Sequence, residues 1–367
     1  MKLAFLMGLV WCESLLYASG IGIQISLYEY FILAALVYSF ILYFTEPQRE
    51  FTKLSKLLFL TVPVIALFQY VGFEISGTYT LKYISAFTVT YIISRQNVKA
   101  KEILFTSYVY GGLGFAVLLI YNFGNAFSGW NPNHIGILCM FSYLFLVCGI
   151  CTLKRDRIKL TFLLLISLLY FILLNKCASR GATLFCCLAL ICVLNRRKVA
   201  YLYAKTSFRN IVVLIPLIMA FGVVLFSRYA DMAYWDAWSE SNWGKTLFNG
   251  RDILWGIGLE KVAQHWIMGI GNLSVLNWHN SAITTLVAFG FLGYSLLSMI
   301  YLSILKKASF YSKDTICNML ITVFAVIYLE QSVELGMVAE KVYFIPYAAL
   351  GLILGRINTI KRSNVCN

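Results

Sequence analysis

Apolar segments long enough to cross a lipid bilayer recur along almost the whole of this 367-residue chain. A helix that crosses a bilayer needs about 20 mostly apolar residues, because hydrocarbon offers no partner for an open backbone polar group. The composition agrees, since 60% of the residues are hydrophobic and only 13% are charged, whereas soluble chains carry about a quarter charged residues. We therefore expect an all-α polytopic membrane protein, with residues 1–367 forming a single integral membrane domain.

The apolar segments predict about 12 transmembrane helices. The predicted spans are Leu3–Tyr17, Leu27–Phe44, Leu57–Phe73, Tyr79–Ile93, Ile103–Phe123, His134–Cys151, Ile158–Leu174, Ala182–Leu194, Ile211–Ser227, Ser281–Leu305, Thr315–Leu329 and Val342–Gly355. Residues 228–280, between the ninth and tenth spans, are too polar to sit in lipid. They predict one large loop outside the membrane.

The basic residues orient these spans. Cytoplasmic loops of membrane proteins are enriched in Lys and Arg, and a cytoplasmic N-terminus places most of the 30 basic residues inside. Both termini are then cytoplasmic, and the loop 228–280 is extracytoplasmic. The net charge of +14 therefore reflects topology and gives no reason to expect a nucleic-acid partner. The ten cysteines fall mostly within spans, so no disulfide framework is expected. No two Cys–x–x–Cys pairs exist, so no zinc site is expected either.

Histidine and tryptophan gather on the predicted outer side. All three histidines, His134, His265 and His279, lie there. So do all the tryptophans except Trp11, namely Trp130, Trp235, Trp238, Trp243, Trp255, Trp266 and Trp278. An aromatic belt at the membrane interface is one explanation, although a belt should form at both interfaces. Stacking against the apolar faces of sugars is the other, and the sequence leaves both open.

Three outer arginines, Arg180, Arg228 and Arg251, are candidates for ligand binding. A guanidinium on this side gains nothing from the charge asymmetry that orients the spans. It can form a salt bridge, as Arg251 could with Asp252 or Glu260, or it can clamp a phosphate or diphosphate through paired hydrogen bonds. The loop holds no Asp–x–Asp pair, so we expect no metal in the site.

Within the loop, residues 251–266 are expected to form an amphipathic helix in or near the outer interface. Its apolar residues recur at helical spacing and are Trp255, Leu259, Val262 and Trp266. Asn249 and Gly250 precede this helix and suit an N-terminal cap, at an end that attracts anions. The sequence Gly269-Ile270-Gly271 then predicts a tight turn, and by itself it is a weak signal for phosphate binding.

Five short motifs, taken in order, resemble those of the O-antigen ligase and O-antigen polymerase superfamily. His279-Asn280 is followed by nine residues, Gly290, two residues and Gly293, as in that family. The motifs before it are Asn131-Pro132-Asn133, Ser179-Arg180-Gly181, Gly250-Arg251 with Trp255, and Gly269-Ile270-Gly271. About 12 spans and a large outer loop between spans nine and ten are also similar to the family's layout.

The resemblance implies a glycosyltransferase of the bacterial plasma (inner) membrane whose active site faces outward. It implies an undecaprenyl-diphosphate-linked glycan as donor, inversion at the anomeric carbon, no metal and no cofactor. By position, Arg180 and Arg251 would hold the diphosphate, and His279 would be the general base. The further substrate-binding candidates are Arg228, His265, Asn280, Trp278, Asn133 and His134.

The acceptor is left open. A polymerase extends a lipid-linked repeat unit into O-antigen or capsule-type polysaccharide, whereas a ligase transfers the finished glycan to lipid A-core or another acceptor. The compact size and modest loop favour the polymerase, for which a chain-length regulator protein would be a further partner. A transporter of lipid-linked glycan is a third reading, but its ionisable residues should lie near the bilayer midplane, and here they gather at the outer ends of the spans.

Overall fold

The computed structural model describes residues 2–19, 77–124, 130–177, 179–271, 278–334 and 343–365, together with residues 33, 34, 37, 38, 41 and 337. Over these residues the chain forms 13 helices and no strand, which agrees with an all-α fold. The spans predicted at 27–44 and 57–73 lie almost wholly outside the described residues. Each of the other predicted spans coincides with a helix.

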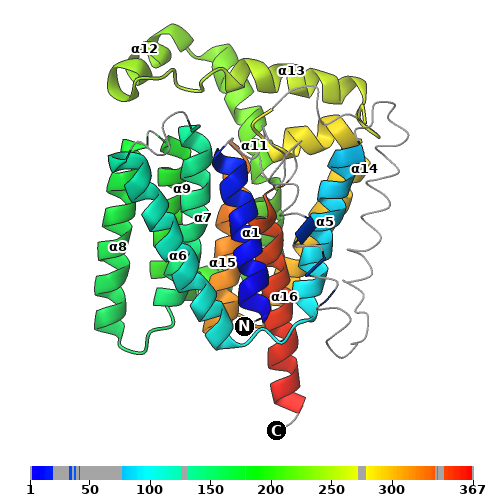
Figure 1. The fold of residues 1–367 in the computed structure, drawn as a ribbon. Helices are drawn as coiled ribbons and strands as arrows, with labels where there is room; N and C mark the ends of the chain where they lie inside the picture. The colour runs from blue at the N-terminus through cyan, green and yellow to red at the C-terminus, as the bar shows by residue number, and fades with distance from the viewer. Residues whose placement is uncertain are drawn as a thin grey trace.

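These helices form the body of the molecule (Figure 1). They are α1 (Lys2–Ser19), α5 (Gly77–Arg95), α6 (Ala100–Phe123), α7 (Pro132–Ile150), α8 (Asp156–Lys176), α9 (Arg180–Leu194), α11 (Thr206–Tyr229), α14 (Ser281–Ser309), α15 (Thr315–Glu330) and α16 (Phe344–Val365). Five of them, α6, α7, α8, α11 and α14, are long and apolar enough to cross a membrane. Apolar side chains also cover the outward faces of α8 and α11, where Leu168 is 56% exposed and Phe221 48%. Exposed apolar faces of this kind are typical of helices in membrane proteins.

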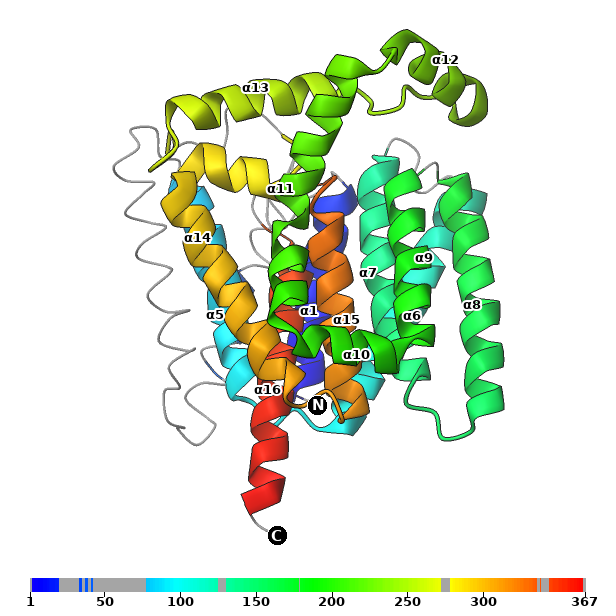
Figure 2. The same cartoon turned by 180° about the vertical axis from the view of Figure 1, so that it is seen from behind.

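Three further helices are α10 (Arg196–Ala204), α12 (Met232–Trp243) and α13 (Arg251–Gln264). Figures 1 and 2 show α12 and α13 lying across one end of the bundle, while both ends of the chain lie at the opposite end. Helix α7 runs through the interior, and every residue from Ile135 to Ile150 is buried. The described residues of the polar segment 228–280 therefore cover one end of an apolar bundle.

Helix α13 differs in detail from the expected amphipathic helix. It ends at Gln264, so Trp266 lies beyond it and is 60% exposed. Trp255 faces inward and is buried among residues of α11 and α14. The N-cap is Gly250, in the left-handed conformation at φ 75°, and no side chain caps this end. Asn249 therefore does not supply the expected cap.

Helix α14 is two helical segments joined by a bend, where the sequence predicts one uninterrupted span. Gly290 adopts φ 62° and ψ −167°, which no α-helix contains. The segment 266–271 occupies the bend, as the Ile270 N–H donates to the Val287 carbonyl at 2.7 Å and the Phe291 N–H to the Trp266 carbonyl at 2.7 Å. These bonds satisfy backbone groups that the bend removes from the helix.

The glycines at this junction allow two backbones to touch. A Cβ built on Gly290 would lie 2.2 Å from the Ile267 carbonyl oxygen, and one on Gly269 would lie 2.6 Å from the Ala288 carbonyl carbon. Both glycines also have positive φ, which other residues rarely adopt. Gly269-Ile270-Gly271 is thus a turn that packs against α14, and this packing accounts for its glycines without a phosphate.

Candidate functional site

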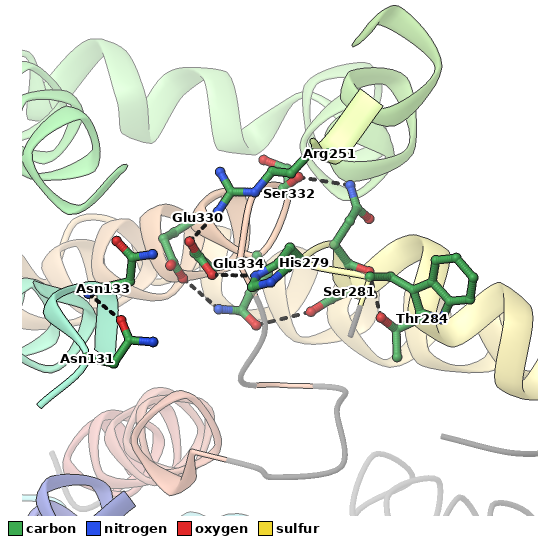
Figure 3. Close-up of polar contacts among 12 residues, drawn as sticks. Asn131, Asn133, Arg251, His279, Ser281, Thr284, Glu330, Ser332 and Glu334 are labelled. Carbon is green, nitrogen blue, oxygen red and sulfur yellow. Dashed lines mark hydrogen bonds and ion pairs between the residues drawn. The ribbon is translucent and has the colours of Figure 1, made fainter. Parts of the chain in front are cut away.

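Glu334 joins Arg251 to His279 beneath α13 (Figure 3). An Arg251 Nη2 donates to Glu334 Oε1, and His279 Nδ1 lies 3.0 Å from Glu334 Oε2. The three residues come from separate places, since Arg251 begins α13, His279 precedes α14, and Glu334 follows α15. The side chains of Arg251 and His279 are 22% and 35% exposed, whereas that of Glu334 is 12% exposed. The cation and the imidazole are therefore the groups that a ligand can reach.

Asn280 fixes the backbone that carries His279. It is fully buried and caps α14, because its Oδ1 accepts from the N–H groups of Ala282 and Ile283. Its Nδ2 donates to the carbonyls of Pro216 and Ser332, at 2.8 and 2.9 Å. These bonds use the whole hydrogen-bonding capacity of the amide. The amide of Asn280, a predicted substrate-binding residue, thus ties together α11, α14 and the segment that carries Glu334.

Trp278, also expected to bind substrate, lies in the core. It is 2% exposed and packs with Trp255 and Ile283. The Trp255 Nε1–H donates to the Trp278 carbonyl at 2.6 Å, which holds the start of α14 under α13. His279, between these two anchored residues, adopts the left-handed conformation at φ 47°. Such a conformation costs free energy and is concentrated at functional sites.

The electrostatics of Glu334 favour its ionised form. Burial acts to raise the pKa of this carboxyl, but the hydrogen bond from His279, the charge of Arg251 and the proximity of His279 and His134 outweigh burial and lower the pKa below its ordinary value. Glu334 is therefore an anion at neutral pH. The ionised carboxylate accepts a hydrogen bond from Nδ1–H of His279, and in that tautomer the lone pair of the imidazole lies on Nε2.

Three cations converge on the cleft beside this cluster. The cleft is lined by Asn133, Ile137, Ser179, Arg180, Gly181, Ala182, Lys245, Asn249, Arg251 and Glu334. Arg180 begins α9, and its guanidinium bonds to Ser239 Oγ at 3.4 Å and to the Thr246 carbonyl at 3.3 Å. Lys245 lies in the connection between α12 and α13. With three cations against one carboxylate, the cleft carries a net positive charge.

Comparison with known proteins adds no assignment. No family model matches the chain, and no characterised protein or solved structure matches it. The geometry of the described residues is therefore the ground on which a function is proposed.

The remaining candidates from the sequence are divided. Asn133 lines the cleft, and His134, at the start of α7, is near enough to Glu334 to lower its pKa. Arg228, in the last turn of α11, and His265, at the end of α13, are both exposed and are not among the residues that line the cleft. The structure thus groups Arg180, Arg251, His279, Asn133 and His134, and leaves Arg228 and His265 apart.

Glu334 and Lys245 are the site residues that sequence reasoning missed. Arg251 does form an ion pair, but its partner is Glu334 and not Asp252 or Glu260. Arg251 is the first residue of α13, and its side chain contacts Glu334, which follows the end of α15. A signal was present in the sequence, since a polar run from Glu330 to Glu334 ends an apolar segment on the predicted outer side. Lys245 had no local signal, because its role depends on how the connection between α12 and α13 folds back.

Proposed function

We propose that this protein is a glycosyltransferase of the bacterial plasma membrane that uses an undecaprenyl-diphosphate-linked glycan as donor. In this proposal about 12 helices span the bilayer, both termini are cytoplasmic, and the end covered by α12 and α13 faces outward. The position of both chain ends opposite α12 and α13 supports this topology. The observation that carries the function is the convergence of Arg180, Lys245 and Arg251 beside the His279–Glu334 pair.

The cations would receive the diphosphate of the donor. Cleavage of the sugar–phosphate bond leaves negative charge on the diphosphate, and fixed positive groups in a partly enclosed site stabilise that charge. The guanidiniums can each bond two phosphate oxygens, whereas the ammonium of Lys245 acts as a point charge. In the structure Arg251 is already paired with Glu334, so a bound diphosphate would share this arginine with the carboxylate.

His279 would act as the general base. In the transfer step, the acceptor hydroxyl oxygen bonds to the anomeric carbon of the donor, and the bond from that carbon to the diphosphate oxygen breaks. The electron pair leaves with undecaprenyl diphosphate, and the hydroxyl proton passes to Nε2 of His279. Attack from the face opposite the leaving group inverts the anomeric centre. Glu334 positions the imidazole and stabilises the imidazolium that forms, as a carboxylate does in a catalytic triad.

Reconstitution tests this proposal directly. Purified protein in liposomes, supplied with lipid-linked repeat unit and no ion gradient, is expected to produce polymer. The variant His279→Ala should produce none. A transporter would instead move the lipid-linked glycan between leaflets without joining repeat units. If the protein moved the lipid-linked glycan between leaflets and formed no glycosidic bond, it would be a transporter and the proposed enzyme activity would be wrong.

Polymerisation is the first choice of reaction, and ligation is the alternative. Both use the same donor, so the cation-lined cleft serves either, and the compact loop 228–280 favours the polymerase. The glycan profile of a deletion strain separates the two. A single repeat unit on the surface acceptor indicates a polymerase, whereas long chains retained on the lipid carrier indicate a ligase.

A further inference from the structure

The end of α11 and helix α12 together present a row of aromatic rings beside the cation-lined cleft. Phe226, Trp235, Trp238 and Trp243 follow one another through edge-to-face contacts, with ring centroids 6.0, 6.0 and 4.9 Å apart. Trp238 is 40% exposed and Trp243 is 53% exposed. The end of the row nearest the cleft is therefore open to a ligand.

Trp243 connects this row to the candidate donor site. The Arg180 guanidinium lies 5.8 Å from the centre of the Trp243 ring. Arg180 also bonds to Ser239 on α12 and to the Thr246 carbonyl just after it. Whatever is attached to a diphosphate held by Arg180 would next meet the surface of α12, and in the proposed donor that group is the glycan or the lipid.

The composition of α12 favours the glycan. Its exposed rings alternate with polar groups, since Glu240, Ser241 and Asn242 are also exposed. The helix contains no Leu, Ile or Val, whereas a surface made for acyl chains has an aliphatic face. A sugar ring presents an apolar face edged by hydroxyls, so it pairs with an aromatic ring flanked by hydrogen-bonding side chains.

We infer that Trp238 and Trp243 form a saccharide-binding platform that holds the first sugars of the donor glycan next to its diphosphate. This inference rests on the proposed function and assigns a part of the substrate to a surface. The diphosphate would lie against Arg180, Lys245 and Arg251, and the glycan would extend along α12, which lies across the end of the bundle (Figure 2).

The test compares two probes on the full-length protein in nanodiscs. Inorganic diphosphate reports the cation cleft alone, and purified lipid-linked repeat unit reports the cleft and the platform together. Trp238→Ala and Trp243→Phe are the informative variants, since the Arg180 guanidinium lies over the ring of Trp243 and not of Trp238, and phenylalanine at position 243 keeps a ring beneath the guanidinium. Trp266→Ala is the matched control, because Trp266 is an exposed tryptophan that follows the end of α13 opposite to Arg251 and the cleft.

We expect Trp238→Ala to weaken binding of the lipid-linked repeat unit about tenfold, equivalent to about 1.4 kcal/mol, with diphosphate binding unchanged. Trp243→Phe should have a smaller effect in the same direction, and Trp266→Ala should affect neither probe. If Trp238→Ala weakened the binding of both probes equally, α12 would only support Arg180. If it changed the binding of neither probe, the tryptophans would belong to an aromatic belt at the membrane interface. Either result would overturn the saccharide-binding platform. If the wild-type protein does not bind diphosphate, the proposed function itself fails.

Discussion

Nδ1 of His279 lies 3.0 Å from Oε2 of Glu334, although the two residues are 55 positions apart in the chain. The other oxygen of the same carboxylate binds Arg251. One carboxylate, 12% exposed, thus links the proposed general base to an arginine that is proposed to bind the donor. Any substrate that engages Arg251 changes the charge balance felt by His279.

Replacement of Glu334 by Gln should separate binding from turnover. The neutral amide no longer competes for Arg251, so we expect inorganic diphosphate to bind several-fold more tightly. The amide also no longer fixes the imidazole, so turnover should fall by about tenfold or more, within the range of general-base effects. Titration calorimetry and polymer formation measure the two quantities.

The matched control is Glu260→Gln, which removes an exposed carboxylate from α13. It should change neither quantity by more than about twofold, because exposed charges are screened. Should Glu334→Gln weaken diphosphate binding and turnover together, the carboxylate supports the fold of the site and does not position the base.

The pH dependence of stability should carry the signature of the same carboxylate. Its pKa lies below the ordinary value of about 4.3 because the hydrogen bond and charges from His279, Arg251 and His134 outweigh burial. Stability from the ionised form is therefore present in full above about pH 4.3 and is lost as pH falls through the lower folded-state value. Thermal unfolding of the wild type and of Glu334→Gln should differ by a constant amount from pH 7 to pH 5 and converge only in stronger acid. Convergence already at pH 6 would assign the effect to another group.

The sequence specifies much of the fold but less of the site. Apolar runs locate the helices because lipid and core both demand continuous apolar surface. The bend at Gly290 could not be predicted from such a run, since it depends on the segment 266–271 docking against α14. The role of Glu334 could not be predicted for the same reason, because its two partners lie on other elements. Asn280 and Trp278 show the converse, as residues beside His279 in the chain prove to be its supports.

Activity should require the guanidinium group of Arg251. Arg251→Lys keeps the charge but loses the planar pair of donors that can serve Glu334 and a phosphate together. We expect polymer formation to be abolished while the protein remains inserted in the membrane. Arg157→Lys makes the same change at an exposed position on the opposite end of the molecule and should have no effect. Normal chain length in Arg251→Lys would exclude a bidentate clamp at this position.

The reaction should proceed without a divalent metal. Three cations line the cleft where the diphosphate would lie, and they can stabilise the charge of the leaving group. Polymer formation in liposomes should therefore be unchanged by EDTA. Activity that is lost in EDTA and restored by Mg²⁺ or Mn²⁺ would assign part of the charge stabilisation to a metal.

The junction between α14 and the segment 266–271 should not tolerate a side chain at Gly290. In Gly290→Ala the new Cβ would lie 2.2 Å from the Ile267 carbonyl oxygen, at a positive φ that alanine adopts only with strain. Relief requires the two backbones to separate, which breaks the hydrogen bonds that dock the segment 266–271 against α14. We expect a loss of about 3 kcal/mol or more in stability, measured by thermal unfolding in detergent, together with loss of activity.

The control is Gly256→Ala, because this glycine lies within α13 with open space at its Cβ position. Alanine there should be neutral or stabilising by up to about 1 kcal/mol. Equal stability of the two variants would mean that the bend is not required for the fold of the site.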